Sequence, residues 1–229
     1  IGPLLEKLDD EINFIGSESD DISGELNITS AEDFGVHVLP KLITDFNELY
    51  PRVQFNVTLT NTGIDLVKNN IDAAIKIGKL KDSSFKVKKL GYVKMIMAAK
   101  PEYLSKFGTP KTKEDLQNHK LYSFSNIGTP NLMDEFNRKF SADKKVKPVL
   151  TSNNFSMLRN MALTGKGVTL LPDFYCKDFI EEGRLVRVFE SWDRAKSQVS
   201  IVYPDKIKVS PKLRVFLDFM GERTKDYLL

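Results

Sequence analysis

The order of the predicted strands and helices indicates an α/β protein made of two successive α/β runs. Over residues 24–78, a strand, a helix, a strand, a helix and a strand follow one another. This order is typical of right-handed crossovers and a parallel sheet. The strand over residues 71–78 is almost entirely apolar, so we expect it to be central and covered on both faces. A second run of the same kind follows, and a helix closes the chain.

Alternation and helical spacing predict the elements of the first run. Residues 26–30 alternate between apolar and polar side chains, as a half-buried strand does. Apolar residues over 38–50 recur at spacings of three and four and predict a helix, in which Pro40 marks either the start or a kink. Alternation predicts the next strand over residues 53–59. After a turn, residues 64–67 are expected to form a short helix.

The second run is predicted from shorter apolar stretches separated by turn and cap residues. Pro101 suits the first turn of a helix, and Asp173 is placed to cap another helix directly after Pro172. Ser210 and Pro211 form an N-cap and N1 pair for the closing helix. The expected strands cover residues 92–99, 121–124, 146–150, 165–171 with its turn, 183–188 and 199–203, and the expected helices begin at 101 and cover 155–163, 173–180 and 210–224.

Residues 1–15 carry an apolar stripe at helical spacing, with charged residues on the other face. This amphipathic helix could lie on its own domain, or it could be the end of a longer dimerising helix. The sequence leaves both possibilities open. An acidic polar linker over residues 16–21 follows it.

Composition excludes several classes of protein. With 229 residues, of which 41% are hydrophobic, the chain can bury a core as one large or two small domains. The net charge of 34 − 31 = +3 is too balanced for a dedicated nucleic-acid-binding surface, and no apolar run is long enough to span a membrane.

The counts of reactive residues argue against a metal site and against catalysis. A single cysteine excludes an internal disulfide, which fits a reducing compartment such as the cytoplasm, although a small binding protein outside the cytoplasm could also lack disulfides. The two histidines, His37 and His119, stand alone and form no metal-binding spacing with that cysteine. We find no nucleophile and base pair, so we expect neither an enzyme nor a cofactor.

Short motifs in a fixed order carry a resemblance to a known family. They include a Leu-Pro in the first helix, an Asp-Ala-Ala-Ile strand ending in Gly78, and a Gly-Lys-Gly-Val turn before a later strand. Across residues 23–222 the chain resembles the effector-binding domain of LysR-type transcriptional regulators. The segments that carry the resemblance are Gly24-Glu25-Leu26-Asn27-Ile28, Leu39-Pro40, Tyr50-Pro51, Asp72-Ala73-Ala74-Ile75-Lys76-Ile77-Gly78, Lys100-Pro101-Glu102-Tyr103-Leu104, Gly165-Lys166-Gly167-Val168, Gly183-Arg184-Leu185-Val186 and Lys212-Leu213-Arg214.

The resemblance implies two Rossmann-like subdomains with an interdomain cleft, joined by two crossover strands, as in type 2 periplasmic binding proteins. Residues 1–22 would then be the end of a linker helix and a polar linker. Subdomain I would take residues 23–98 and 201–229, and subdomain II residues 99–200. The chain would hinge near Ala98-Ala99 and Ile201-Val202.

The implied partners are a small-molecule effector, a second copy of the chain in a homodimer or homotetramer, and DNA, with no membrane. DNA would be bound through an N-terminal domain absent from these residues. The family pairs its domains side by side and antiparallel, with the first helix and second strand of one copy against the other half of its partner. Here that face would include neighbours of Val38, Leu42 and Phe46 on the outer side of the helix, with residues 55–59 at a sheet edge. The alternative is a periplasmic-type solute-binding protein of a transport system, against which the apolar stripe of residues 1–15 argues.

Open α/β sheets bind ligands beyond the carboxyl ends of their strands, and this rule selects the candidate site. Hydroxyl, amide and ammonium groups at these ends suit a small anion. The alternative for each position is an ordinary helix cap or turn residue. The selected residues are Thr29, Ser30, Thr60, Asn61 and Lys76 from the first run, and Ser123, Ser125, Ser152, Asn153 and Asn154 from the second.

Two further features have unremarkable interpretations. The lysines between residues 79 and 94 are interrupted by Asp82 and lack productively interleaved aromatic residues, so they indicate a solvated face rather than a nucleic-acid site. Cys176 lies on a predicted helix, where a buried thiol is favoured over a redox sensor.

Overall fold

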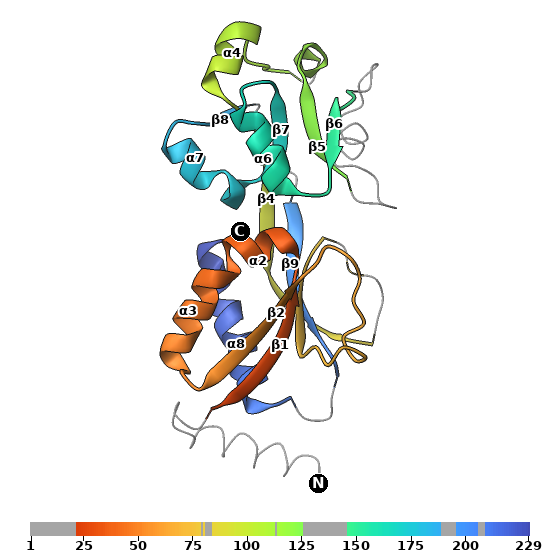
Figure 1. Cartoon of the computed structure of the whole chain (residues 1–229), viewed down its shortest axis with the longest axis vertical. Helices are drawn as coiled ribbons and strands as arrows, with labels where there is room; N and C mark the ends of the chain where they lie inside the picture. The colour runs from red at the N-terminus through yellow and green to blue at the C-terminus, as the bar shows by residue number, and fades with distance from the viewer. Residues whose placement is uncertain are drawn as a thin grey trace. The chain divides into compact units, whose positions relative to one another are not determined.

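The computed structural model describes residues 22–78, 80, 84–112, 114–125, 146–188, 196–205 and 209–229 (Figure 1). The helix predicted over residues 1–15 and the linker after it lie outside the described residues. Within the described parts, no helix has both the length and the apolar character that crossing a membrane requires.

The chain forms two compact units. Unit 1 contains the described residues up to Gly91 together with Gln198–Leu229, and unit 2 is Tyr92–Ser197. The chain passes between them within β4 (Lys86–Ala99) and β9 (Lys196–Tyr203). The subdomain boundaries that we expect from the sequence also fall within these two strands, and they stay predictions.

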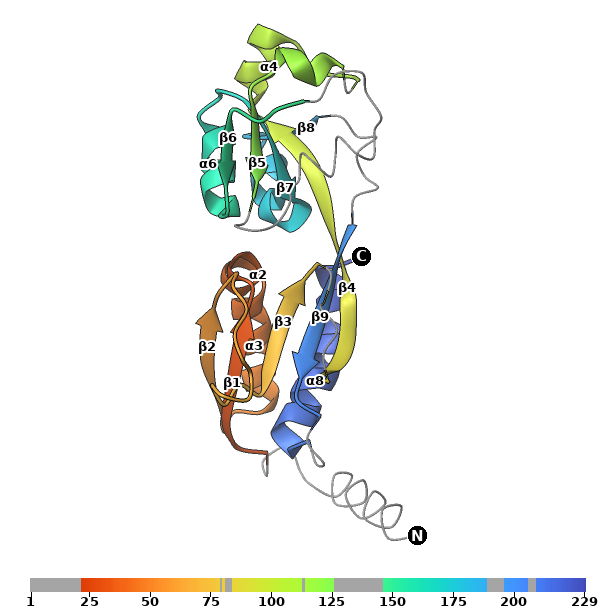
Figure 2. The ribbon, with the colours of Figure 1, turned by 90° about the vertical axis from the view of Figure 1, so that its right-hand side faces the viewer.

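Unit 1 is built on a sheet in the strand order β2-β1-β3-β9, with β4 next to β9. β1 (Gly24–Ser30) runs parallel to β2 (Val53–Leu59) and to β3 (Ala73–Ile77), as predicted. β9 returns antiparallel to β3. The apolar strand is therefore central, and its first three residues are buried (Figure 2).

Helices α2 (Glu32–His37), α3 (Leu39–Leu49) and α8 (Pro211–Arg223) belong to the same unit. Phe46 of α3 is fully buried and lies edge-on to Phe55 of β2, at 5.5 Å between ring centroids, and to Phe216 and Phe219 of α8, at 5.6 and 5.2 Å. These rings join α3 and α8 to one face of the sheet. Pro40 lies in the first turn of α3, so it marks a start rather than a kink.

Two predictions for unit 1 are wrong in detail. Residues 64–65 are irregular and residues 66–70 form a turn instead of a short helix, because the Asp65 carboxylate accepts the backbone N–H groups of Val67 and Lys68, each at 3.1 Å. Aspartate often competes with helix formation in this way. Ser210 does occupy the N-cap position of α8, but its hydroxyl makes no capping hydrogen bond.

Unit 2 has the strand order β4-β7-β5-β6, and β8 pairs with the other edge of β4. β7 is antiparallel to β4 and parallel to β5, which is parallel to β6. The strand predicted over residues 146–150 is displaced, because Pro148 lacks the N–H that a ladder needs. The elements of this unit are α4 (Pro101–Phe107), η2 (Asp115–Asn118), β5 (Leu121–Phe124), β6 (Leu150–Ser152), α6 (Phe155–Leu163), β7 (Val168–Pro172), η3 (Asp173–Tyr175), α7 (Lys177–Glu181) and β8 (Val186–Val188), and the short η5 (Thr224–Asp226) belongs to unit 1.

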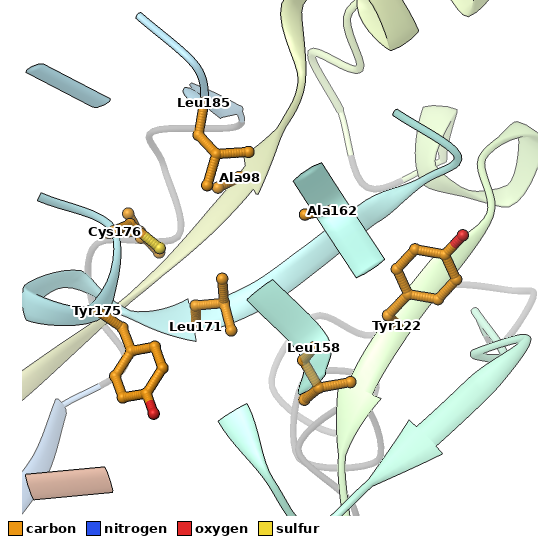
Figure 3. Packing of buried hydrophobic residues seen from close by; sticks show 9 residues of the cluster. Ala98, Tyr122, Leu158, Ala162, Leu171, Tyr175, Cys176 and Leu185 are labelled. Atoms are coloured by element: carbon orange, nitrogen blue, oxygen red, sulfur yellow. The ribbon is translucent and has the colours of Figure 1, made fainter. Parts of the chain in front are cut away.

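The core of unit 2 packs α6 and the η3–α7 segment against the sheet (Figure 3). Leu158 and Ala162 of α6 meet Leu171 of β7 in this core. The helix predicted over residues 173–180 is broken at Cys176 into η3 and α7. Asp173 does not cap a long helix, because its carboxylate accepts the adjacent N–H of Phe174 at 2.8 Å.

Gly167 should be required for the stability of unit 2. A Cβ at this position would lie 2.5 Å from the backbone oxygen of Lys120 and 2.8 Å from the ring of Tyr122. Neither atom is the end of a flexible side chain, so Gly167→Ala should lower the free energy of unfolding by about 1–3 kcal/mol. Urea denaturation measures the change. Gly63→Ala, where a Cβ meets nothing within 4 Å, is the matched control. Equal midpoints for the two variants would contradict this packing.

The thiol of Cys176 should be inert in the native protein. The residue is fully buried, and this burial raises the pKa of the thiol to about 12. Since only the thiolate reacts, labelling by a thiol reagent at pH 8 should be slow in buffer and complete in guanidinium. The chain has one cysteine, so the labelling rate reports on this residue alone. Rapid labelling of the folded protein would revive the redox-sensor alternative.

Candidate functional site

The carboxyl end of the unit 1 sheet brings together three of the predicted residues. The N–H of Thr60 donates to the carbonyl of Ser30 at 2.9 Å, and the next residue, Asn61, accepts the N–H of Glu32 through Oδ1 at 3.2 Å. The Asn61 amide nitrogen is buried and has no hydrogen-bond partner among the described residues. Ser30, Thr60 and Asn61 therefore form one polar edge at the start of α2.

Internal hydrogen bonds account for two of the predicted side chains in unit 1. Thr29 is buried and donates to the carbonyl of Thr58 at 2.8 Å. The hydroxyl of Thr60 lies 2.8 Å from that of Thr62 within a turn. These two hydroxyls therefore have partners within the strand and the turn, and their role in ligand binding stays a prediction. The hydroxyl of Ser30, which is 1% exposed, donates to the neighbouring carbonyl of Ala31 at 3.1 Å.

Lys76 lies on the face of the sheet opposite to Ser30. In the register of the sheet, Ser30 pairs with Ile75, so these two side chains share a face. Lys76 comes next along β3 and pairs with Ser200 of β9. The two predicted residues thus reach the same end of the sheet from different faces.

The ammonium of Lys76 is half-buried and has no carboxylate partner among the described residues. This burial lowers its pKa. Two other lysines of unit 1 are paired: Lys86 lies 2.7 Å from Asp205, and Lys88 lies 2.7 Å from Asp218. Lys76, in contrast, carries a partly desolvated charge without an anion nearby in the described parts of this unit.

Two polar residues of β9 share the face of Lys76, and the sequence rule did not select them. Ser200 is buried, and its hydroxyl accepts a hydrogen bond of 2.8 Å from the amide of Gln198. Gln198 and Ser200 are polar side chains at alternate positions of β9, and this spacing is a signal that could have indicated them. Together with Lys76 they form a polar cluster in the middle strands of the sheet.

In unit 2, capping and turn bonds account for part of the predicted set. Asn154 caps α6 by accepting the N–H of Met157 at 2.9 Å, and the hydroxyl of Ser152 accepts the N–H of Asn154 at 3.2 Å. The N–H of Ser125 donates to the carbonyl of Ser152 at 3.0 Å, and Asn153 is exposed. These four residues lie together at the start of α6.

Ser123 is separated from that group by strand alternation. Its neighbours Tyr122 and Phe124 face the core beside α6, so the side chain of Ser123 lies on the other face of β5. It is fully buried, and its hydroxyl has no partner among the described residues.

Sequence reasoning missed a second cation that has no counter-charge among the residues that the structure describes. Arg159 of α6 is partly buried, and its guanidinium carbon lies 5.0 Å from the ring centre of Tyr175 and 4.8 Å from that of Phe179. The hydroxyl of Tyr175 lies 2.7 Å from that of Ser156. An arginine inside an apolar helix stripe, beside Met157 and Leu158, was the available signal.

The remaining candidates have structural explanations. His119 lies 3.2 Å from the hydroxyl of Tyr103, and burial lowers the pKa of the imidazole. In the basic stretch, Lys86 and Lys88 form ion pairs, whereas Lys79 and Lys81 lie outside the described residues. Over the described ranges, no three His, Cys, Asp or Glu residues are grouped to hold a metal ion.

Known proteins share this fold and much of this sequence. Residues 19–225 match the family described as the LysR substrate binding domain. The HTH-type transcriptional regulator CrgA of Neisseria meningitidis serogroup C is 32% identical over 204 residues, which are 87% of this chain and 67% of that regulator. The chain thus spans about two thirds of this relative's length.

Solved structures agree with the sequence comparison. The regulatory domain of CrgA, a LysR-type transcriptional regulator, has a TM-score of 0.76 and 30% identity, over 88% of this chain and 99% of that domain. Full-length AphB of Vibrio cholerae has a TM-score of 0.71 and 26% identity, over 96% of this chain and 75% of AphB. The relatives are transcriptional regulators rather than transport proteins, which removes the solute-binding alternative. This chain is a LysR substrate-binding domain, the regulatory part of a LysR-type transcriptional regulator.

Proposed function

We propose that this domain senses a small organic anion, and that unit 1 binds the anionic group of this effector through Lys76. The single observation that carries the proposal is the half-buried ammonium with no counter-charge among the described residues. Desolvating a charge is costly unless an opposite charge or hydrogen bonds compensate for it. A bound anion supplies that compensation.

Gln198 and Ser200 support the proposal because they share the face of Lys76. An amide and a hydroxyl beside an ammonium can each donate to the oxygens of an anion. Lys76 stands where the commonest subgroup of the family has an arginine. Since an ammonium is a compact point charge, it suits one oxygen rather than a bidentate pair. Ser30, Thr60 and Asn61 stay predicted contacts for the rest of the effector, and a site between the two units also stays a prediction.

The parent protein would bind DNA through a further domain, because this chain spans about two thirds of its relative. Because a transcriptional regulator acts where the DNA is, we propose that the parent protein works in the bacterial cytoplasm. We also propose that it has no catalytic activity. Effector binding would then change DNA binding by shifting the population of domain conformations.

Replacing Lys76 by methionine should weaken the response to anions without harming the fold. In a thermal-shift screen of small organic anions, the wild type should gain stability with at least one compound. Lys76→Met should bind that compound about tenfold more weakly or worse, since a hydrogen bond to a charged group contributes about 1.5–3 kcal/mol. The unliganded variant should melt at or above the wild-type temperature, because a poorly solvated charge is gone.

Lys86→Met is the matched control for this screen. It removes an exposed lysine paired with Asp205 and should leave every anion response unchanged. Ser30→Ala tests the opposite face of the sheet in the same screen. The Lys76 site is wrong if Lys76→Met responds to each hit as the wild type does, or if no compound stabilises the wild type.

Self-association would use neighbours of Val38, Leu42 and Phe46 on the outer side of the helix, as the resemblance implies, because these three residues are themselves buried within unit 1. The exposed apolar residues nearby are Val36 and Leu49, at 54% and 48% exposure, and Val57 on the edge strand β2, at 40%.

Val57→Lys should therefore convert a dimer of this domain into monomers, because a lysine on an edge strand opposes pairing with another chain. Sedimentation velocity at micromolar concentration measures the change. Val87→Lys, at an equally exposed valine of β4, should keep the wild-type assembly. A wild type that sediments only as a monomer would refute the dimer.

A further inference from the structure

The guanidinium of Arg159 lies over two aromatic rings. Its central carbon lies 5.0 Å from the ring centre of Tyr175 and 4.8 Å from that of Phe179. Its Nε atom is buried and makes no hydrogen bond to any described residue. Nor does a carboxylate of the described chain pair with this cation. The rings contribute cation–π attraction, yet they supply no hydrogen-bond acceptor of the kind that a guanidinium usually finds.

Arg184 shows what an ordinary arginine does beside the same ring. Its guanidinium carbon lies 4.6 Å from the ring centre of Phe179, so it stacks as closely as Arg159 does. However, Arg184 is exposed and pairs with Glu182 at 3.1 Å. Stacking on Phe179 therefore does not explain why Arg159 lacks an anionic partner.

Ser156 places a hydroxyl beside this guanidinium. It lies three residues before Arg159 on α6, so the two side chains share one side of the helix. Tyr175 orders both of them, since its hydroxyl lies 2.7 Å from that of Ser156 and its ring lies under Arg159. Tyr175 is itself 2% exposed, and Figure 3 shows its hydroxyl directed away from Cys176 and Leu171.

The shape of these donors selects a carboxylate. A guanidinium presents its N–H groups as a planar fork that matches two coplanar oxygens. Because Nε is covered, the two terminal nitrogens remain for the ligand. Phe155 and Phe179 are partly buried beside Tyr175 and offer apolar contact to whatever carries the carboxylate. We propose that unit 2 has its own position for a small carboxylate with an apolar group, formed by Arg159 and Ser156 and separate from the Lys76 site.

Isothermal titration calorimetry of the whole domain with phenylacetate, acetate and sulfate tests this proposal. The wild type should bind phenylacetate more tightly than acetate, and sulfate least. Arg159→Lys keeps the charge and loses the fork, so its affinity for phenylacetate should fall about tenfold or more. Ser156→Ala should weaken binding by a smaller factor. Arg184→Gln, the matched control on the same ring, should bind as the wild type does.

Three results would overturn the proposal. One is an unchanged affinity in an Arg159→Lys variant with wild-type circular dichroism, and another is equal binding of sulfate and phenylacetate. The third combines two observations: the wild type does not bind phenylacetate, and Arg159→Gln sediments as a smaller species than the wild type. This result would mean that the guanidinium pairs with a carboxylate of a second copy of the chain.

The Lys76 variant separates this proposal from the proposed function. Phenylacetate should still bind to Lys76→Met through Arg159. If Lys76→Met and Arg159→Lys abolish one and the same binding event, the separate position in unit 2 is wrong while the proposed function stands. If Lys76→Met leaves every anion response intact and Arg159→Lys does not, the proposed function of Lys76 is wrong while the separate position in unit 2 stands.

Discussion

The packing of Phe46 constrains the architecture of unit 1. This fully buried ring meets Phe55 of β2 and also Phe216 and Phe219 of α8, near the other end of the described chain. Burying one such side chain contributes about 1.5–3 kcal/mol, and each favourable aromatic pair adds about 0.5–1.5 kcal/mol. To bring α8 to this cluster, the chain must return from unit 2 to unit 1, and β9 is the strand in which it does so. The antiparallel pairing of β9 with β3 places Ser200 beside Lys76. The aromatic core and the proposed anion site therefore depend on the same long-range closure.

Each unit keeps a partly buried cation without an anionic partner among the described residues. Such a charge opposes stability, because burial removes solvation that nothing in the described chain replaces. Lys76 bears this cost on a central strand, and Arg159 bears it on a helix, where aromatic faces offset part of it. A protein that only had to fold could replace either residue with an apolar one of similar size. Retaining both cations is easier to explain by ligands that pair with them than by the packing of the domain.

Local patterns in the sequence predicted most elements of the fold. The strand of residues 53–59 and the helix of residues 155–163 have the predicted bounds, because alternation and helical spacing are clear there. The misses have local causes that compete with the pattern, such as Asp65 bonding to the N–H groups that follow it and Pro148 lacking a donor. The break at Cys176 left no comparable signal, since residues 173–180 contain neither glycine nor proline. The pairing of β9 with β3 joins residues far apart in the chain, so no local pattern could indicate it.

The candidate site shows what the strand-end rule can and cannot select. It names residues near one edge of a sheet, but it does not give the face on which each side chain lies, which follows from the strand register. Ser30 and Lys76 are therefore both at the edge and yet on opposite faces.

The rule also does not distinguish a ligand contact from a cap. That distinction comes from asking which polar groups the chain already satisfies. Thr29 and Asn154 bond to the backbone and need nothing more. The amide of Asn61, the ammonium of Lys76 and the guanidinium of Arg159 retain donors that no described residue accepts. Positions that remain unsatisfied in a well-packed domain are the ones at which a ligand changes the energy most, so they are the better guide to where an effector is sensed.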